Sequence, residues 1–275
     1  MTRTGPASVS IIIPTLNEAE GLPAILTSIA RQTVVPLEVI VADANSTDGT
    51  RAIAREHGAI VTDGGLPSVA RNKAATIAEG DYLLFLDADS NLPVHFLERA
   101  IPEFEDRGLD VAALLMRPRS RLRIDALLFG TIERIMRTMN TFYPSLHGAG
   151  MLIRRRLHER IKGFDERLRV DEDTDYGERA RKQGKFGVIL STYYTFSTRR
   201  FDSEGRLNMM RKYFNQNVLR NLRPLGITYQ MPYEFANFKH RDLNKTERFV
   251  ENMLGEIEHL QAELTNLGKP KRARR

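Results

Sequence analysis

The sequence predicts an α/β fold: a mostly parallel sheet flanked by helices and followed by a C-terminal helical extension. Short, continuous apolar runs alternate with segments of helical spacing through the first half of the chain. Such runs are typical of strands that are buried on both faces. Acidic and amide side chains directly follow three of these runs, at the strand ends where open α/β sheets bind their ligands.

The first half supplies the strands and helices of this sheet in alternation. The expected strands are Val9–Ile13, Leu37–Val41, Ile60–Thr62, Tyr82–Leu86 and Val111–Met116. The expected helices are Asn17–Arg31, Asp48–Glu56, Pro67–Glu79 and Pro93–Glu105. The first helix has apolar residues at helical spacing, and the second begins in a cluster of Ser, Thr and Asp that can cap it. Because each strand returns through a helix, the pairing is predicted to be parallel.

The second half is less regular. Its expected helices are Ile124–Met139, Thr174–Gln183 and Ser203–Leu222, and its expected strands are Gly148–Ile153 and Phe186–Leu190. Residues 243–267 then show a heptad pattern of apolar side chains. It spans only about three heptads, so it is compatible both with a short coiled coil that forms a homodimer and with an amphipathic helix packed on its own domain.

These patterns divide the chain into four parts. Residues 1–7 form a flexible N-terminus, 8–200 the sheet domain, 201–268 the helical extension and 269–275 a basic tail. The net charge is +6, but removing the five basic residues of that tail leaves 36 basic and 35 acidic residues. The body is therefore nearly neutral, and we expect a solvated tail with no nucleic-acid partner.

Composition excludes several classes of protein. The chain has no cysteine, which excludes disulfides, thiolate metal sites and a cysteine nucleophile. No apolar run approaches the roughly 20 residues that span a bilayer, and Met1 to Ser8 do not resemble a signal peptide. We expect a cytoplasmic protein. The amphipathic stretch Ile124–Met139 has arginines around it, which leaves peripheral membrane contact open beside packing in the core.

The strongest chemical signal is Asp87-Ala88-Asp89, directly after an expected strand. Two carboxylates on a strand-end loop suit a hard divalent cation such as Mg²⁺ or Mn²⁺. Such a cation can bridge to the diphosphate of a nucleotide. The alternative is a loop that caps the helix after Pro93, through Asp89 or Ser90.

A second signal is the acidic run Asp171-Glu172-Asp173-Thr174-Asp175. A helix N-terminus favours one or two acids, which explains part of this run. Four acids in five residues repel one another, so the run also indicates a carboxylate placed as a general base. An aspartate with a pKa of about 4 is ionised at neutral pH and can accept a hydroxyl proton.

Taken together, the sequence resembles glycosyltransferase family 2, whose members have the nucleotide-sugar-binding, Rossmann-like GT-A fold. The resemblance runs from about Ser8 to about Gly187 and keeps the family's order and spacing. It rests on the segments SIIIPTLNEAEGL, VIVADANSTDGT, ARNKAATIAEGDYLLFLDADS, GAGMLIRR, GFDERL and DEDTDYGERARKQG. It implies an enzyme that transfers a sugar from a nucleotide-diphospho-sugar to a hydroxyl of a glycan or lipid-linked acceptor.

The resemblance implies a donor site along the strand ends. Pro14, Leu16 and Glu18 fall where the family contacts the nucleoside. Asp43 falls where an acid reads the base or ribose, and Arg71 where a basic side chain meets the nucleotide. Taken singly, each of these residues also has an ordinary structural explanation as a strand end or helix residue.

Further positions concern the cation and the sugar. Asp87 and Asp89 match the family's DxD motif, with Asp89 expected as the direct ligand of Mn²⁺ or Mg²⁺. Gly148 and Gly150 match a loop beside the sugar and acceptor, although two glycines also suit a simple turn.

The expected catalytic residue is Asp173, which matches the base of the family's acidic motif. Glu172 and Asp175 would support it. Arg199 and Arg200 replace a histidine often found downstream in the family, and they are expected either to neutralise the leaving diphosphate or to be exposed at a strand end.

Three departures from the family pattern matter. Ala44 stands where many members have a second acid, which leaves base selectivity open. The chain has no tryptophan and hence lacks the motif of processive synthases, so one sugar per binding event is expected. His147 borders the glycine loop and is either an acceptor contact or a packed residue.

The expected function is that of an inverting, non-processive transferase, and two other functions compete with it. A sugar nucleotidyltransferase needs a glycine- and arginine-rich phosphate loop after the first strand, and the segment PTLNEAEGL lacks one. A non-catalytic scaffold would assemble through the heptads of 243–267, but it has no need of Asp89 and Asp173. Both features favour the transferase.

Overall fold

The computed structural model describes residues 8–139, 150–168, 172–206, 208 and 244–255. They divide into two compact units. The sheet unit comprises residues up to Arg117 together with Ile132–Phe196, and the second unit comprises Pro118–Thr131 and the residues from Ser197 onward. Each unit is described by itself.

The described part of the sheet unit is built on an eight-stranded sheet in the order β3-β2-β1-β4-β7-β6-β8-β5. The strands are β1 (Val9–Thr15), β2 (Glu38–Asp43), β3 (Ile60–Asp63), β4 (Tyr82–Phe85), β5 (Ser90–Asn91), β6 (Val111–Pro118), β7 (Met151–Arg154) and β8 (Phe186–Phe196). The strands β1 to β4 pair in parallel. β7 lies antiparallel between β4 and β6, so β6 still runs in the direction of β4.

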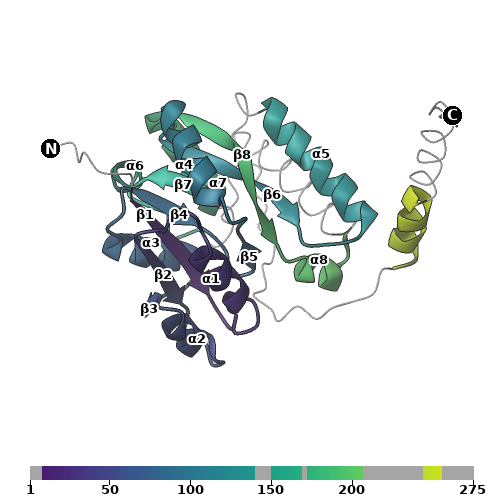
Figure 1. Cartoon of the computed structure of the whole chain (residues 1–275), viewed down its shortest axis with the longest axis horizontal. Coiled ribbons are helices and arrows are strands. Elements are labelled where there is room, and N and C mark those ends of the chain that lie inside the picture. Colours follow the sequence, from purple (N-terminus) through teal and green to yellow (C-terminus); the bar gives the residue numbers. More distant parts are fainter. Residues whose placement is uncertain (1–7, 140–149, 169–171, 207, 209–243, 256–275) are drawn as a thin grey trace, which may run out of the picture. The chain divides into compact units, whose positions relative to one another are not determined.

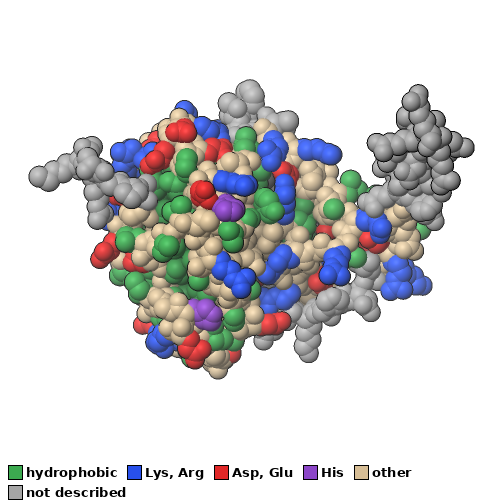
Figure 2. Space-filling view, viewed as in Figure 1, with side chains coloured by type: hydrophobic (Ala, Val, Ile, Leu, Met, Phe, Trp, Pro, Cys, Tyr) green, Lys and Arg blue, Asp and Glu red, His purple; other side chains and the backbone are tan. Residues whose placement is uncertain are grey.

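Helices cover both faces of this sheet (Figure 1). Side chains of α1 (Leu22–Ala30), α2 (Thr50–Glu56) and α4 (Phe96–Asp106) pack with Ile11, Ile13 and Val41 in one core. Side chains of α3 (Pro67–Ile77), α6 (Arg155–Arg160) and α7 (Glu172–Gln183) pack with Ile12 and Ile40 in the other. Alternate residues of one strand thus point to opposite cores, which explains the continuous apolar runs. Figure 2 shows acidic and basic side chains interspersed over one face.

The predicted fold class is confirmed, with shifts at several element ends. β1 continues through Pro14 to Thr15, so Pro14 does not end the strand. α1 begins at Leu22 rather than Asn17, because Asn17 has a left-handed φ of 53° and belongs to a loop. α4 begins at Phe96 rather than Pro93. β5 and α6 are not predicted from the sequence, since each is too short for a periodic pattern.

An aromatic cluster fills the core beneath α7. The Phe164 and Tyr176 rings stack with centroids 4.0 Å apart, and the Phe85 ring packs edge-on against Phe164 at 5.3 Å. Nδ1 of His158 shares a 2.7 Å hydrogen bond with the Tyr176 hydroxyl. His158 is only 7% exposed, and burial, followed by the nearby Arg179 charge, lowers its pKa to about 4. The imidazole is therefore neutral at physiological pH.

The second unit is held together by a buried arginine. The Arg206 guanidinium is paired with Asp125 through distances of 2.8 and 3.0 Å, and it also binds Asp202. Asp125 lies on α5 (Arg123–Met139), and Asp202 lies on α8 (Arg199–Glu204). The Glu251 carboxylate accepts hydrogen bonds from the first backbone N–H groups of α5. Removing one partner of such a buried pair would leave an uncompensated charge, which typically costs several kcal/mol.

Two expectations fall partly in this second unit. The helix expected at Ser203–Leu222 is interrupted, because α8 ends at Glu204 and Gly205 has a φ of 84°. Residues 245–255 are helical and begin inside the expected heptad segment. The rest of both segments and the basic tail lie outside the described residues. Over the described part of the chain, the helices are too short or too polar to cross a bilayer.

Gly150→Ala is expected to lower the free energy of unfolding by about 2–4 kcal/mol. Gly150 has a φ of 88°, and an added Cβ would overlap the Tyr194 ring. Urea denaturation followed by circular dichroism measures the loss. Gly108→Ala is the control, because Gly108 has a φ of 59° but no atom within 4 Å of an added Cβ. The control should lose only about 1 kcal/mol. Equal losses in the two variants would contradict a role for the Tyr194 contact.

Because His158 is buried and neutral, we expect the free energy of unfolding to fall in mild acid. The unfolded histidine binds a proton below its usual pKa of about 6.5, whereas the folded one resists protonation until about pH 4. The contribution of neutral His158 to the free energy of unfolding is therefore present above pH 6.5 and is lost as the pH falls toward 4. The loss is about 2 kcal/mol between pH 7 and 5. Urea denaturation at both pH values should show a smaller loss in His158→Gln. His57 is exposed, so the control variant His57→Gln should lose as much free energy of unfolding between the two pH values as the unchanged protein.

Candidate active site

The carboxyl end of β2 presents Asp43, whose side chain is buried. Its Oδ2 accepts hydrogen bonds from the Thr15 hydroxyl at 3.1 Å and the Ser46 hydroxyl at 2.5 Å. Its Oδ1 accepts one from the Ser46 N–H at 3.0 Å and lies 3.6 Å from an Arg51 nitrogen. These contacts fix the turn after β2. Contact between Asp43 and a nucleoside therefore stays a prediction.

The loop after β1 carries the other expected nucleoside contacts. Leu16 is 41% exposed, while Pro14 and Glu18 are half-buried. The loop is tied to the start of α2, because the Glu18 N–H donates to the Thr50 hydroxyl at 2.9 Å and the Asn17 N–H donates to the Ser46 hydroxyl at 2.8 Å. The ends of β1 and β2 thus form one connected rim.

The turn after β4 carries the DxD pair. The Ser90 N–H donates to the Asp87 carbonyl at 3.0 Å, which closes the turn. The Asp87 side chain is 43% exposed, and Asp89 is half-buried. Among the described residues, no three acidic, histidine or cysteine side chains form a metal cluster. Two carboxylates on one turn still fit Mg²⁺ or Mn²⁺, which commonly takes its remaining ligands from water and substrate phosphates.

Arg71 of α3 joins this turn to the acidic run. One guanidinium nitrogen lies 3.2 Å from Asp87 Oδ1, and another lies 3.1 Å from Glu172 Oε1. Arg71 is only 4% exposed, and its Nε is buried without a hydrogen-bond partner. The guanidinium also lies 5.5 Å from the centre of the Phe164 ring. The site therefore brings together three segments that are far apart in the sequence.

The described acids of the run at the start of α7 occupy three different environments. Burial and the neighbouring Asp173 charge raise the pKa of Glu172, although Arg71 opposes this shift. Oδ1 of half-buried Asp173 accepts a 2.7 Å hydrogen bond from the Thr174 N–H. Asp175 instead pairs with Arg179, one turn further along the helix, at 2.7 Å. Asp175 thus has a structural partner, whereas Glu172 shares Arg71 with the DxD turn.

Several expected residues are placed elsewhere or lie outside the described chain. Gly148 and His147 belong to the segment that is not described. Gly150 starts the approach to β7, where its N–H donates to the Phe85 carbonyl at 3.0 Å. Arg199 and Arg200 are in α8 of the second unit, and Arg200 pairs with Glu204 at 3.0 Å. Their contact with a diphosphate remains a prediction.

Two side chains important to the site were not predicted. Arg179 was overlooked although it stands four residues after Asp175, a spacing that favours an ion pair on a helix. Tyr176 lies on the buried face of α7, just after the acidic run, and no local pattern predicts its role. Asn72 of α3 binds the backbone of Phe164, a contact between distant segments that no local pattern indicates.

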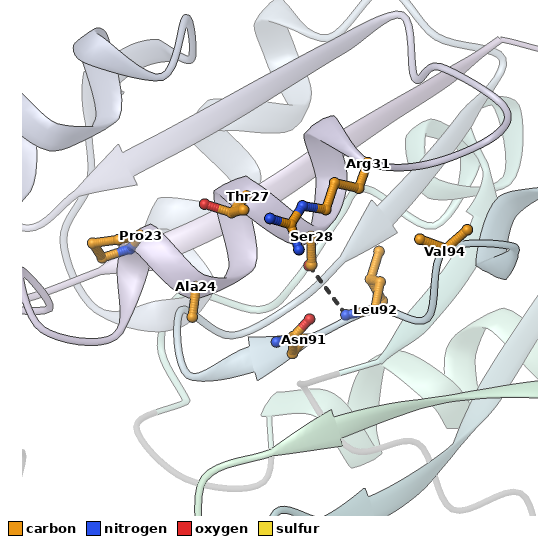
Figure 3. Close-up of a pocket in the computed structure, with 8 residues that line it drawn as sticks. All are labelled: Pro23, Ala24, Thr27, Ser28, Arg31, Asn91, Leu92 and Val94. Carbon is orange, nitrogen blue, oxygen red and sulfur yellow. Dashed lines mark hydrogen bonds between the residues drawn. The ribbon is translucent and has the colours of Figure 1, made fainter.

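A separate hollow of about 410 Å³ has α1 on one side, and β5 and the residues directly after β5 on the other (Figure 3). Its walls are joined by a 3.1 Å hydrogen bond from the Leu92 N–H to the Ser28 hydroxyl. None of the predicted site residues lines it. The lining residues are Pro23, Ala24, Thr27, Ser28, Arg31, Asn91, Leu92 and Val94.

Two curated relatives are similar to part of the chain. A "PGL/p-HBAD biosynthesis glycosyltransferase" of Mycobacterium tuberculosis (strain ATCC 25177 / H37Ra) is 45% identical over 92 residues, which cover 30% of this chain and 36% of that protein. The "Succinoglycan biosynthesis protein ExoA" of Rhizobium meliloti is 30% identical over 192 residues, covering 63% of this chain and 58% of that protein. The chain thus spans less than two thirds of either relative.

Solved structures show the same fold. TarS 1-349 of S. aureus in complex with UDP has a TM-score of 0.56 at 25% identity, covering 70% of this chain and 62% of that one. The mannosyltransferase PcManGT of Pyrobaculum calidifontis, in complex with GDP-Man and Mn²⁺, has a TM-score of 0.62 at 23% identity, covering 83% and 67%.

These likenesses agree with the family assignment. The chain has the GT-A glycosyltransferase fold, with a curled sheet flanked by helices. The model of the family "Glycosyl transferase family 2" matches residues 10–162, more than half of the chain. The protein belongs to this family.

Proposed function

We propose that the protein is a glycosyltransferase that transfers one sugar per binding event from a nucleotide-diphospho-sugar to an acceptor hydroxyl, with inversion at the anomeric carbon. The observation that carries the proposal is the position of Arg71. Its guanidinium binds both Asp87 of the DxD turn and Glu172, the neighbour of Asp173. One buried side chain thus joins the turn where the leaving diphosphate is expected to the residue next to the expected base.

Asp173 is the general base in this proposal. It would accept the proton of the acceptor hydroxyl as the hydroxyl oxygen bonds to the anomeric carbon. In the same step the bond from that carbon to the diphosphate oxygen breaks, and the electron pair leaves with the nucleoside diphosphate. One displacement inverts the anomeric centre and needs no covalent enzyme intermediate.

Asp87 and Asp89 would hold the divalent cation, which supplies electrostatic stabilisation of the negative charge on the leaving diphosphate. PcManGT, a solved structure of the same fold, is in complex with GDP-Man and Mn²⁺. Burial and the neighbouring Asp173 charge raise the pKa of Glu172, so added positive charge near this carboxyl is favourable.

The donor and acceptor classes are proposed from the relatives. TarS structures hold UDP or UDP-GlcNAc, and PcManGT holds GDP-Man. A uridine or guanosine diphospho-sugar is therefore the first donor to test. Two relatives are named for glycan or PGL/p-HBAD biosynthesis, which fits a glycan or lipid-linked acceptor. Peripheral membrane contact, a cytoplasmic location and a coiled-coil homodimer remain predictions from the sequence.

The donor site is tested by thermal shift with UDP, GDP, UDP-GlcNAc and GDP-mannose, each with Mn²⁺ and with a chelator. We expect stabilisation by one nucleotide that depends on Mn²⁺, because a ligand that binds only the folded state raises its stability, by about 2.7 kcal/mol at 100 times Kd. Asp89→Asn should remove the Mn²⁺-dependent part. No shift with any pair, or an undiminished shift in Asp89→Asn, would contradict the proposed cation site.

The base is tested by Asp173→Asn. We expect release of nucleoside diphosphate from the donor selected above to fall by about 10²–10⁴-fold, because the amide cannot accept the hydroxyl proton. Nucleotide binding should stay within about twofold. The control is Glu178→Gln, an exposed acid on the same helix that should leave turnover unchanged. Retained turnover in Asp173→Asn would remove that residue from the role.

A further inference from the structure

The turn Ile161–Phe164 is held between α3 and α7. Lys162 and Gly163 both have left-handed backbones, with φ of 62° and 65°. A Cβ on Gly163 would come within 2.5 Å of the Asn72 side-chain oxygen. The turn therefore lies too close to α3 for any side chain at Gly163, and its shape is fixed by what touches it from either side.

From α3, Asn72 binds the turn with both ends of its carboxamide. Its Nδ2 donates to the Phe164 carbonyl at 2.9 Å, and its Oδ1 accepts from the Phe164 N–H at 2.8 Å. The side chain thus pairs with one residue's backbone as a neighbouring strand would. An alanine offers neither group, and an aspartate offers only acceptors.

From α7, Arg179 binds the other side of the turn. One nitrogen donates to the Ile161 carbonyl at 2.6 Å and to the Gly163 carbonyl at 2.7 Å. Nε donates to Asp175 Oδ2 at 2.8 Å. The guanidinium therefore joins the acidic turn of α7 to two carbonyls at once. A lysine has the charge but not the planar fork that makes these three bonds together.

The two contacts fix the helix that carries the expected base. Arg71, the residue before Asn72, binds Glu172 at the first turn of α7. Asn72 and Arg179 join the same two helices through the turn, further along α7. α7 also packs in the core through Tyr176 and Ala180, and these polar contacts add a defined position for its first turns.

We propose that Asn72 and Arg179 are positioning residues for Asp173, acting through the turn Ile161–Phe164. The inference rests on the proposed function, because it takes Asp173 as the base. A displacement of about 1 Å at a reacting group can cost about 10²-fold in rate. Loss of either contact should therefore lower kcat while leaving the donor site, which is built on the strand ends, intact.

The test compares Arg179→Lys and Asn72→Ala with the exposed control Arg181→Lys. Release of nucleoside diphosphate from the selected donor is measured at a temperature where circular dichroism shows folded protein. We expect kcat to fall about 10–100-fold in both variants, with the donor KM and nucleotide Kd within about twofold. Arg179→Lys should keep part of the rate that Arg179→Ala loses. The control should match the unchanged enzyme.

Three results would overturn the inference: unchanged kcat in the folded variants, a raised donor KM at constant kcat, or loss of folding in both Arg179→Lys and Asn72→Ala. The last would assign the two residues to stability alone. The double variant Asp173→Asn/Arg179→Lys separates this inference from the proposed function. If Arg179 acts through Asp173, Arg179→Lys should lower kcat no further in that background. Full turnover in Asp173→Asn alone would instead reject the proposed base.

Discussion

The candidate active site depends on one buried positive charge, the guanidinium of Arg71. Arg71 is almost wholly withdrawn from water, and a buried guanidinium is costly unless acidic groups face it. Its partners come from the turn after β4 and from the first turn of α7, 101 residues away in the sequence in the case of Glu172. The fold must therefore bring α3, β4 and α7 together for the charge to be compensated, and the same convergence forms the candidate site.

The acidic run shows why such a cluster is tolerated. Glu172 shares Arg71 with Asp87, and Asp175 pairs with Arg179. Asp173 lies between them at a helix start, where the macrodipole favours negative charge. Two of these acids are thus bound by arginines, and Asp173 lies between them, where the acceptor is proposed to bind. A run that looks repulsive in sequence is divided among different partners in space.

The sequence predicts the part of this arrangement that is local. Continuous apolar runs predicted β1, β2, β3, β4 and β6 nearly in full. The prediction that Asp87 and Asp89 follow a strand also agrees with the structure. What it could not show are pairings between distant segments. No spacing indicates that Asp43 is buried by Thr15 and Ser46, or that β7 enters the sheet antiparallel between β4 and β6. The pairing of Arg179 with Asp175 could have been predicted, since a spacing of four residues on a helix favours an ion pair.

The charge balance around Arg71 links the donor to the cation. Asp87 and Glu172 both bind the buried Arg71 guanidinium, and Asp89 and Asp173 are their neighbours in sequence. Burial and the Asp173 charge raise the pKa of Glu172, so further negative charge beside it is unfavourable. A nucleoside diphosphate is itself an anion and would be repelled by such a surface. A divalent cation at Asp87 and Asp89 offsets both charges, so donor and cation are expected to bind each more tightly in the presence of the other.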